Sequence, residues 1–331
     1  MRMKKYIITG GSGFIGTNLI LYLLEKKSKI LNLDNLGYAS NSYLNKKSNQ
    51  NYNFIKVDLA TCKISKLKKI ILKFNPDFII NLAANSHVDN SIEKPRDFVV
   101  SNINATLNLL TSIKDLKKIK FIHIGTDEIY GEIKKEEKKI FNESSKLFPS
   151  SPYSASKASC NHLVNAFSRT YGIKFLIINP SNNFGPYQYP EKLIPKSIIK
   201  IINKNSIPIY KKGKNIRQWM YVRDTCILIY KLTNNSKLEN QSVNLGYGKL
   251  INNLNLIKII FKFIRDKDNG INLKINFVDD RKGHDYKYHS SSEYTKKFIK
   301  FRPSNFVKNL HRTVEWYKIK KNLKLFKNKF K

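Results

Sequence analysis

Cysteine is scarce in this chain of 331 residues, and the three that occur are far apart. Cys62, Cys160 and Cys226 have neither the spacing of a metal site nor that of a redox motif. We therefore predict no metal centre. Isolated cysteines of this kind are typical of small buried hydrophobic side chains in a reducing compartment. The cysteine pattern thus favours a cytoplasmic protein.

Long apolar runs are also missing, so the sequence predicts no membrane-spanning helix and no membrane partner. The basic residues Arg2, Lys4 and Lys5 precede an apolar run, as in a secretory signal. No small-residue cleavage site follows, and the same segment contains a glycine motif that explains it better. We expect these residues to belong to the mature protein. The length suits one large domain or two modest ones.

Acidic residues are few: 24 Asp and Glu stand against 61 Lys and Arg, which gives a formal charge of +37. Such a charge is compatible with nucleic-acid binding. However, Lys supplies nearly all of it, and Lys is spread over the whole length instead of being gathered with Arg and aromatic residues on one element. We interpret the charge as a compositional bias and expect no nucleic-acid partner. The most basic stretch is the C-terminal segment KIKKNLKLFKNKFK, residues 318–331.

Short apolar strands alternate with helical patterns through the first half of the chain. This alternation predicts an α/β fold with a Rossmann-type doubly wound parallel sheet. The expected strands are 6–10, 29–35, 53–59, 77–84, 120–126 and 174–180, and the expected helices are 17–27, 63–74, 97–115 and 153–171.

The pattern changes after residue 180, where Asn, Gly and Pro interrupt the chain. Helices near 192–203 and 223–233 follow, with a strand at 242–246 that could return to the sheet and a short strand at 274–280. We predict an NAD-binding domain and a smaller C-terminal α/β substrate-binding lobe. The expected limits are 1–180 plus about 217–247 for the domain, about 181–216 plus 248–321 for the lobe, and 322–331 for the tail.

A glycine motif, TGGSGFIG, lies between the first strand and the first helix, with Gly10, Gly13 and Gly16 in GxxGxxG spacing. The glycines permit a tight turn and a close backbone approach to a pyrophosphate at the helix N-terminus. Asp34 ends the second strand about 20 residues on, where an acid binds the adenosine ribose. An acid there favours NAD over NADP. The alternative, a simple cluster of turn glycines, is disfavoured by the flanking strand and helix.

Tyr153 and Lys157 are spaced to lie on one face of a helix. A nearby ammonium is expected to lower the phenol pKa, so that the Tyr can serve as a base near neutral pH. Upstream, the stretch GTDEIYG places Asp127 and Glu128 next to each other beyond a strand. Two adjacent acids in a partly buried cleft push their pKa values apart and provide one acid and one base.

These motifs together resemble the extended short-chain dehydrogenase/reductase family. The resemblance narrows to its dTDP-glucose 4,6-dehydratases, whose signature blocks span most of the chain in order: LAANSHVDNSI (82–92), GTDEIYG (125–131), PYSASKA (152–158), SNNFGPYQYPEKLIP (181–195), IRQWMYVRD (216–224) and DDRKGHDYKY (279–288). The resemblance implies that dTDP-glucose is converted to dTDP-4-keto-6-deoxyglucose with enzyme-bound NAD, for deoxysugar synthesis such as that of rhamnose. It also implies a homodimer paired through helices that include the one bearing Tyr153.

By the same resemblance, five residues are catalytic. Tyr153 takes the proton of the sugar 4-OH, Lys157 holds Tyr153 and the nicotinamide ribose, and Thr126 hydrogen-bonds near the 4-oxygen. Glu128 removes the C5 proton, and Asp127 protonates the departing 6-OH. The residues expected to bind NAD are Gly10, Gly13, Phe14, Ile15, Gly16, Asp34, Asn35, Asp58, Leu59, Leu82, Ala83, Ala84, Tyr153 and Lys157. Those expected to bind the nucleotide sugar are Ser86, Asn182, Lys192, Leu193, Pro208, Tyr210, Arg217, Asn253, His284 and Tyr288.

Some alternatives stay open at this level. Asn252 could take the place of its neighbour Asn253, and His284 could be an ordinary satisfied polar residue. The substrate could be UDP-glucose, or the enzyme could be an NDP-sugar epimerase, which would have no need of Asp127 and Glu128. Outside enzymology, the chain could be an inactive member that binds RNA through its basic surface.

Overall fold

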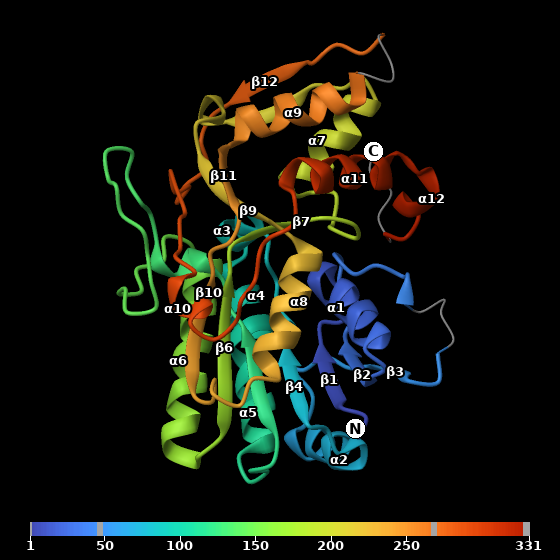
Figure 1. The fold of residues 1–331 in the computed structure, drawn as a ribbon, viewed down its shortest axis with the longest axis vertical. Helices are drawn as coiled ribbons and strands as arrows, with labels where there is room; N and C mark the ends of the chain where they lie inside the picture. The colour runs from blue at the N-terminus through green and yellow to red at the C-terminus, as the bar shows by residue number, and fades with distance from the viewer. Residues whose placement is uncertain (1, 45–48, 266–269, 327–331) are drawn as a thin grey trace.

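The computed structural model describes residues 2–44, 49–265 and 270–326. Its centre is a seven-stranded sheet in which every neighbouring pair is parallel. The spatial order is that of a Rossmann-type sheet extended by one strand, which confirms the predicted α/β class (Figure 1). In that order the strands are β10 (Gln241–Leu245), β6 (Lys174–Pro180), β5 (Lys120–Ile124), β4 (Phe78–Asn81), β1 (Lys5–Thr9), β2 (Lys29–Asp34) and β3 (Tyr52–Lys56).

Helices cover both faces of this sheet, as the apolar runs of its strands require. One face packs against α1 (Phe14–Glu25) and α8 (Val222–Thr233). The other packs against α2 (Ile64–Phe74), α5 (Ala105–Ile113) and α6 (Pro152–Tyr171). Neighbouring residues of one strand serve the two cores: Ile8 of β1 belongs to the first and Ile7 to the second, and both are fully buried.

The helix that carries Tyr153 has strong sequence signals at both ends. Ser151 and Ser154 form a reciprocal capping box, and Pro152 occupies the first helical position, where its missing N–H costs nothing. The helix stops at Gly172, which adopts the left-handed conformation (φ 66°) that favours glycine. These local signals set the two ends of α6 and place Tyr153 in its first turn.

The predicted helix 97–115 is a different structure. It combines the end of α4 (Pro95–Phe98), a π-helix (Val99–Asn104) and α5, and a separate short helix, α3 (Val88–Glu93), precedes it. The π-helical turn is stabilised by Asn102, whose side chain hydrogen-bonds the backbone N–H and C=O of Asn85 and the hydroxyl of Ser156. A single helical period could not reveal this, because the cause is a contact with distant segments.

The smaller lobe holds a third core beyond the carboxyl ends of the sheet (Figure 1). It contains two small sheets, only one of whose strands (β12) was expected from sequence. One sheet has the order β11 (Lys249–Asn252), β9 (Ile216–Tyr221), β7 (Asn182–Phe184), and the other pairs β12 (Ile275–Val278) with β8 (Ile207–Tyr210). The lobe's helices are α7 (Leu193–Ile202), α9 (Asn253–Arg265), α11 (Phe306–Lys318) and α12 (Lys320–Leu323).

Two segments lie elsewhere than the predicted domain limits. A boundary near residue 217 passes through β9, which pairs with two lobe strands. The segment from α10 (Glu293–Lys296) to Phe301 packs back onto the larger domain, where Ile299 joins its core. Sequence periodicity does not report which sheet a short strand joins, so these limits required the tertiary structure.

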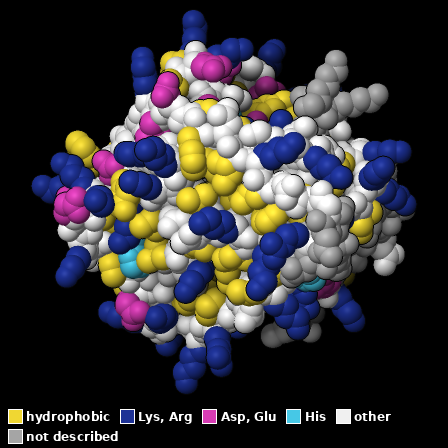
Figure 2. Space-filling view, turned by 90° about the horizontal axis from the view of Figure 1, so that it is seen from above, with side chains coloured by type: hydrophobic (Ala, Val, Ile, Leu, Met, Phe, Trp, Pro, Cys, Tyr) yellow, Lys and Arg dark blue, Asp and Glu magenta, His cyan; other side chains and the backbone are white. Residues whose placement is uncertain are grey.

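Part of the predicted basic tail is ordered against the larger domain. Phe326 is buried and forms a β-bridge with Asn41, and Ser42 donates its N–H to the carbonyl of Leu325. Residues 327–331 lie outside the described residues. On the face seen from the lobe end, Lys and Arg side chains are dispersed among hydrophobic and neutral ones instead of forming one patch (Figure 2). No helix in the described ranges is long and apolar enough to cross a membrane.

Candidate active site

Two adjoining cavities open at the carboxyl ends of the parallel strands. The first lies at the point where the strand order reverses between β1 and β4, which is where ligands bind in open α/β sheets. All fourteen residues predicted to contact NAD line it. The second cavity lies between the larger domain and the lobe, and all ten residues predicted to contact the nucleotide sugar line it. Tyr153 lines both cavities.

The glycine motif allows backbone segments beside the first cavity to approach more closely than side chains would permit. Gly10 has a φ of +67°, and a Cβ there would lie 2.7 Å from the Cα of Ala83. A Cβ on Gly16 would lie 2.3 Å from the carbonyl oxygen of Gly10. Helix α1 begins after Gly13, and no side chain among the described residues caps it there. Its first N–H groups therefore suit a pyrophosphate.

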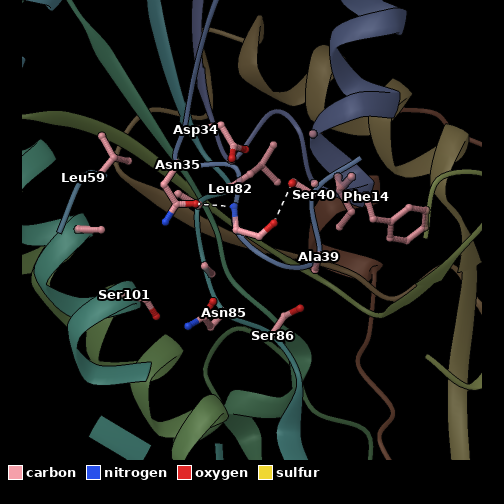
Figure 3. Close-up of a pocket in the computed structure, with 18 of the residues that line it drawn as sticks. Phe14, Asp34, Asn35, Ala39, Ser40, Leu59, Leu82, Asn85, Ser86 and Ser101 are labelled. Atoms are coloured by element: carbon pink, nitrogen blue, oxygen red, sulfur yellow. Dashed lines mark hydrogen bonds between the residues drawn. The ribbon is translucent and has the colours of Figure 1, made fainter. Parts of the chain in front are cut away.

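Asp34 is held at the end of β2 by the backbone. Its carboxylate accepts hydrogen bonds from the N–H groups of Ser12 (2.9 Å) and Leu36 (2.7 Å). The next loop is shaped by Asn35, which accepts from the N–H of Gly37 (2.9 Å), and by Ser40, which donates to the carbonyl of Gly37 (2.7 Å) (Figure 3). The residues present thus fit a dinucleotide whose adenosine ribose approaches Asp34.

The catalytic candidates meet beyond the end of β5. Thr126 is the N-cap of a short 3₁₀-helix (Asp127–Tyr130), and its hydroxyl accepts the N–H of Glu128 at 3.3 Å. This helical turn places Asp127 and Glu128 in the wall of the second cavity with Tyr153. Lys157 is buried and donates to the carbonyl of Ile124 at 2.6 Å, which ties α6 to the last residue of β5.

The two neighbouring acids have unequal surroundings. Burial raises the pKa of Asp127 to about 8, and the charge of Glu128 adds to the rise. Burial also raises the pKa of Glu128, but Arg217, Arg281 and Lys192 oppose that rise. Near neutral pH the arrangement therefore favours the protonated form of Asp127, while the three cations favour the ionised form of Glu128.

The structure corrects one expectation about Tyr153. Lys157 was expected to lower the phenol pKa, but burial raises the pKa of Tyr153 strongly, and the charge of Glu128 adds to it. A hydrogen bond with Thr126 acts in the opposite direction. The ammonium of Lys157 is engaged by the carbonyl of Ile124, and burial lowers its own pKa. Desolvation therefore affects the pKa of the phenol more than a lysine one helical turn away does.

Arg217 is fixed in the second cavity by backbone carbonyls. Its guanidinium donates to the carbonyl oxygens of Asp285 (2.9 Å) and Ile216 (2.9 Å), and it lies 4.2 Å from the ring centre of Tyr288. The phenol of Tyr288 in turn donates to the carboxylate of Asp285 at 2.7 Å. A guanidinium held this way is preorganised for an anionic ligand such as a diphosphate.

The structure shows the surroundings of the two residues that the sequence left open. Asn253 lines the second cavity, and its buried Oδ1 has no hydrogen-bond partner within the described residues, whereas Asn252 accepts the N–H of Asn255 at the start of α9. His284 also lines the cavity and contacts Asp280 (Nδ1 to Oδ1, 2.5 Å). Burial, then Arg281 and Arg217, lower the pKa of His284 to about 4, so it is neutral at pH 7.

Sequence reasoning missed several residues of the second cavity. The charged ones are Asp89, Glu191, Lys196 and Arg281, and Trp219 is the largest apolar one. Asp89 and Arg281 lie inside the blocks SHVD and DDRKGHD, which carried the family resemblance, but no spacing rule relates residues 192 positions apart. Among residues 2–44, 49–265 and 270–326, no three His, Cys, Asp or Glu side chains form a group that could hold a metal.

Comparison with known proteins agrees with this geometry. The family model described as GDP-mannose 4,6 dehydratase matches residues 7–314. The chain is 38% identical to a dTDP-glucose 4,6-dehydratase of Haemophilus influenzae, over 95% of this chain and 98% of that one. It is 35% identical to dTDP-glucose 4,6-dehydratase 1 of Escherichia coli, over 95% and 92%. The crystal structure of a dTDP-glucose 4,6-dehydratase from Streptomyces venezuelae with NAD and TYD bound matches with a TM-score of 0.89 at 32% identity, over 98% and 99%.

The raised pKa of Asp127 predicts how stability depends on pH. The folded protein binds this proton far more tightly than the unfolded chain, whose Asp has the ordinary value of 3.8. The stabilising contribution is therefore complete below about pH 4 and is lost as the pH rises towards 8. Asp127→Asn, which cannot ionise, should gain stability relative to the wild type over this range, by at most about 1.4 kcal/mol per pH unit.

Urea unfolding of both proteins at several pH values between 4 and 8 would measure this difference. Asp115→Asn is the control, because Asp115 is an exposed residue that pairs with Lys68 far from the cavities. Its difference from the wild type should not grow with pH. A pH-independent difference for Asp127→Asn would contradict the inference that Asp127 is protonated in the folded protein.

Proposed function

Because the chain belongs to the GDP-mannose 4,6 dehydratase family and closely resembles its dTDP-glucose 4,6-dehydratases, we propose that it converts dTDP-glucose to dTDP-4-keto-6-deoxyglucose with bound NAD. The observation that carries this proposal is the pair of buried Asp127 and half-buried Glu128 beside Tyr153, where the two cavities adjoin. An elimination of water needs one acid and one base in addition to Tyr153, whereas a C4 epimerisation by transient oxidation needs only the base that takes the 4-OH proton. The pair therefore favours the dehydratase over the epimerase alternative.

NAD fits the first cavity, with its pyrophosphate at the glycine motif and its adenosine ribose at Asp34. When bound, NAD supplies a hydride acceptor for sugar C4 and a hydride donor for C6. The nucleotide sugar fits the second cavity, where Arg217 and Lys192 face its diphosphate. The larger domain thus takes the cofactor, and the lobe takes most of the substrate.

The catalytic side chains divide the proton transfers. Tyr153 accepts the proton of the 4-OH and must be a phenolate to do so, a form that burial opposes and the hydrogen bond with Thr126 favours. Lys157, one helical turn away, holds the nicotinamide ribose. Thr126 hydrogen-bonds the 4-oxygen. The C5 hydrogen is acidified by the 4-ketone, and Glu128 removes it. Asp127 gives its proton to the departing 6-OH, so that water leaves. The proton held by Glu128 then returns to C5. Tyr153 releases the 4-OH proton to solvent, and Asp127 takes up one proton from solvent, so that both groups return to their starting states.

The assembly we propose is a homodimer paired through the α5–α6 face, in the cytoplasm. Leu107 on α5 and Val99 on the preceding π-helix are apolar side chains that are 37% and 48% exposed in the single chain. Burying such side chains against a second copy would remove them from water. A protein with no membrane-spanning helix in its described ranges and with free cysteines suits a reducing compartment.

The reaction itself predicts a defined product. Incubation with dTDP-glucose should yield a sugar nucleotide lighter by one water, without net accumulation of NADH, as seen by mass spectrometry and NADH absorbance. UDP-glucose in a parallel reaction tests the nucleotide preference and should be turned over more slowly. A product of unchanged mass would indicate an epimerase, and salt-sensitive RNA binding without any turnover would favour the RNA-binding alternative.

The roles of the two acids predict that elimination of water can be blocked while oxidation at C4 still occurs. Glu128→Gln should still allow oxidation at C4 but should lower turnover by about 100-fold or more, because a general base contributes that much. Rapid mixing with dTDP-glucose should therefore show bound NADH that forms and persists. Tyr153→Phe is the matched control and should form neither NADH nor product. Full turnover by Glu128→Gln would contradict the assignment.

The proposed dimer predicts that a charged side chain on the α5–α6 face prevents dimer formation. Leu107→Glu should convert the protein to monomers in size-exclusion chromatography with light scattering, because a carboxylate would be buried in an apolar contact. Val307→Glu is the control, since Val307 is also exposed (52%) but lies on α11 of the lobe. Equal masses for Leu107→Glu and the wild type would argue against this face.

A further inference from the structure

One carboxylate of the larger domain reaches two lobe residues across the second cavity. Asp89, in the first turn of α3, accepts a hydrogen bond from Nη1 of Arg281 at 2.6 Å through Oδ1. Its Oδ2 accepts the phenol of Tyr210 at 3.3 Å. All three residues line the second cavity. The side chains of Arg281 and Asp89 are only 21% and 31% exposed. A partly buried, charge-assisted hydrogen bond of this kind is stronger than a surface ion pair.

The lobe presents these two residues from adjacent strands. Tyr210 ends β8, where it pairs in register with Val278, the last residue of β12. Arg281 follows three residues later. The carboxyl ends of both strands therefore converge on one acid of the other domain.

Neighbouring residues of the larger domain also contact the lobe. Lys192 donates to the carbonyl of Ser86 at 2.7 Å, and the amide of Asn90 donates to the phenol of Tyr38, which in turn donates to Glu191 at 3.0 Å. Residues 86–90 thus form the contact at which the lobe closes over both cavities. Asp89 provides the charged interaction of this contact.

Arg281 retains a donor for a ligand while it is held by Asp89. Its Nε is buried and has no hydrogen-bond partner in the described part of the chain. Lys192, Lys196 and Arg217 line the same cavity, so Arg281 belongs to a set of cations suited to a diphosphate. A guanidinium anchored at one nitrogen presents its remaining N–H groups in a fixed plane.

From this geometry we propose that Asp89 is a positioning residue for the dehydration. Its carboxylate anchors Arg281 and Tyr210, and so holds the lobe closed around the diphosphate of the nucleotide sugar. The inference rests on the proposed function, because it assigns the second cavity to that substrate. Asp89 acts through Arg281 and does not touch the reacting carbons. Its loss should therefore weaken substrate binding more than it slows the chemical step.

Asp89→Asn keeps the shape of the side chain and removes its charge. We expect the KM for dTDP-glucose and the Kd for dTDP, measured by calorimetry on the NAD-loaded enzyme, to rise about tenfold, with kcat within about twofold of the wild type. Asp115→Asn, which breaks the exposed pair with Lys68, should change neither constant. Asp89→Glu, which keeps the charge, should restore part of the affinity and serves as the second variant if Asp89→Asn folds poorly.

A double-variant cycle tests whether Asp89 acts through Arg281. Arg281→Gln should raise KM, and adding Asp89→Asn to it should have little further effect. Independent, multiplying effects would overturn the proposal, as would unchanged affinities in Asp89→Asn and Asp89→Glu, or a loss confined to kcat. If the wild type binds dTDP but releases no dehydrated product, the proposed function fails. The dTDP affinities of the variants would still decide the role of Asp89.

Discussion

The site depends on holding two carboxyl groups next to each other in a place where water is scarce. Asp127 and Glu128 follow a fully buried strand, so both lose hydration and each feels the other's charge. The two carboxyl groups have different electrostatic surroundings. Arg217, Arg281 and Lys192 favour the ionised form of Glu128, while the pKa of Asp127 rises to about 8. The repulsion that would destabilise an ordinary core thereby provides an acid and a base side by side.

The cations that support Glu128 come from the lobe, which links the chemistry to the closure of the cleft. Arg217 is fixed by carbonyls of residues 216, 285 and 286, and Arg281 is held by Asp89. Neither arginine would be near Glu128 if the lobe were displaced. The same groups are the ones suited to the diphosphate. Substrate binding, lobe position and the protonation of the acids therefore share one set of charges.

The parallel sheet of the larger domain brings site residues from several strands together. In a parallel sheet the carboxyl ends of all strands lie at the same edge. Residues that follow β1, β2, β4 and β5 therefore lie close together although they are far apart in the sequence. Lys157 ties α6 to the end of β5, and Asn102 ties the loop after β4 to α6 through Ser156. These bonds hold Tyr153 at the boundary between the cofactor and substrate cavities. The π-helical turn that presents Asn102 is part of the same support.

Local patterns in the sequence determined much of this protein. Strand and helix periodicity, the glycine turn, the capping box of α6 and the adjacency of Asp127 and Glu128 are all short-range features, and they predicted the Rossmann-type sheet and residues that do line the two cavities. The four short lobe strands other than β12 were missed because a three- to six-residue strand has too little periodicity of its own. Only the tertiary structure paired Asp89 with Arg281, raised the pKa of Tyr153 against the expected effect of Lys157, and returned residues 293–301 to the larger domain. Each of those outcomes depends on burial or on contacts between segments far apart in the chain, and such contacts leave no periodic signal in the sequence.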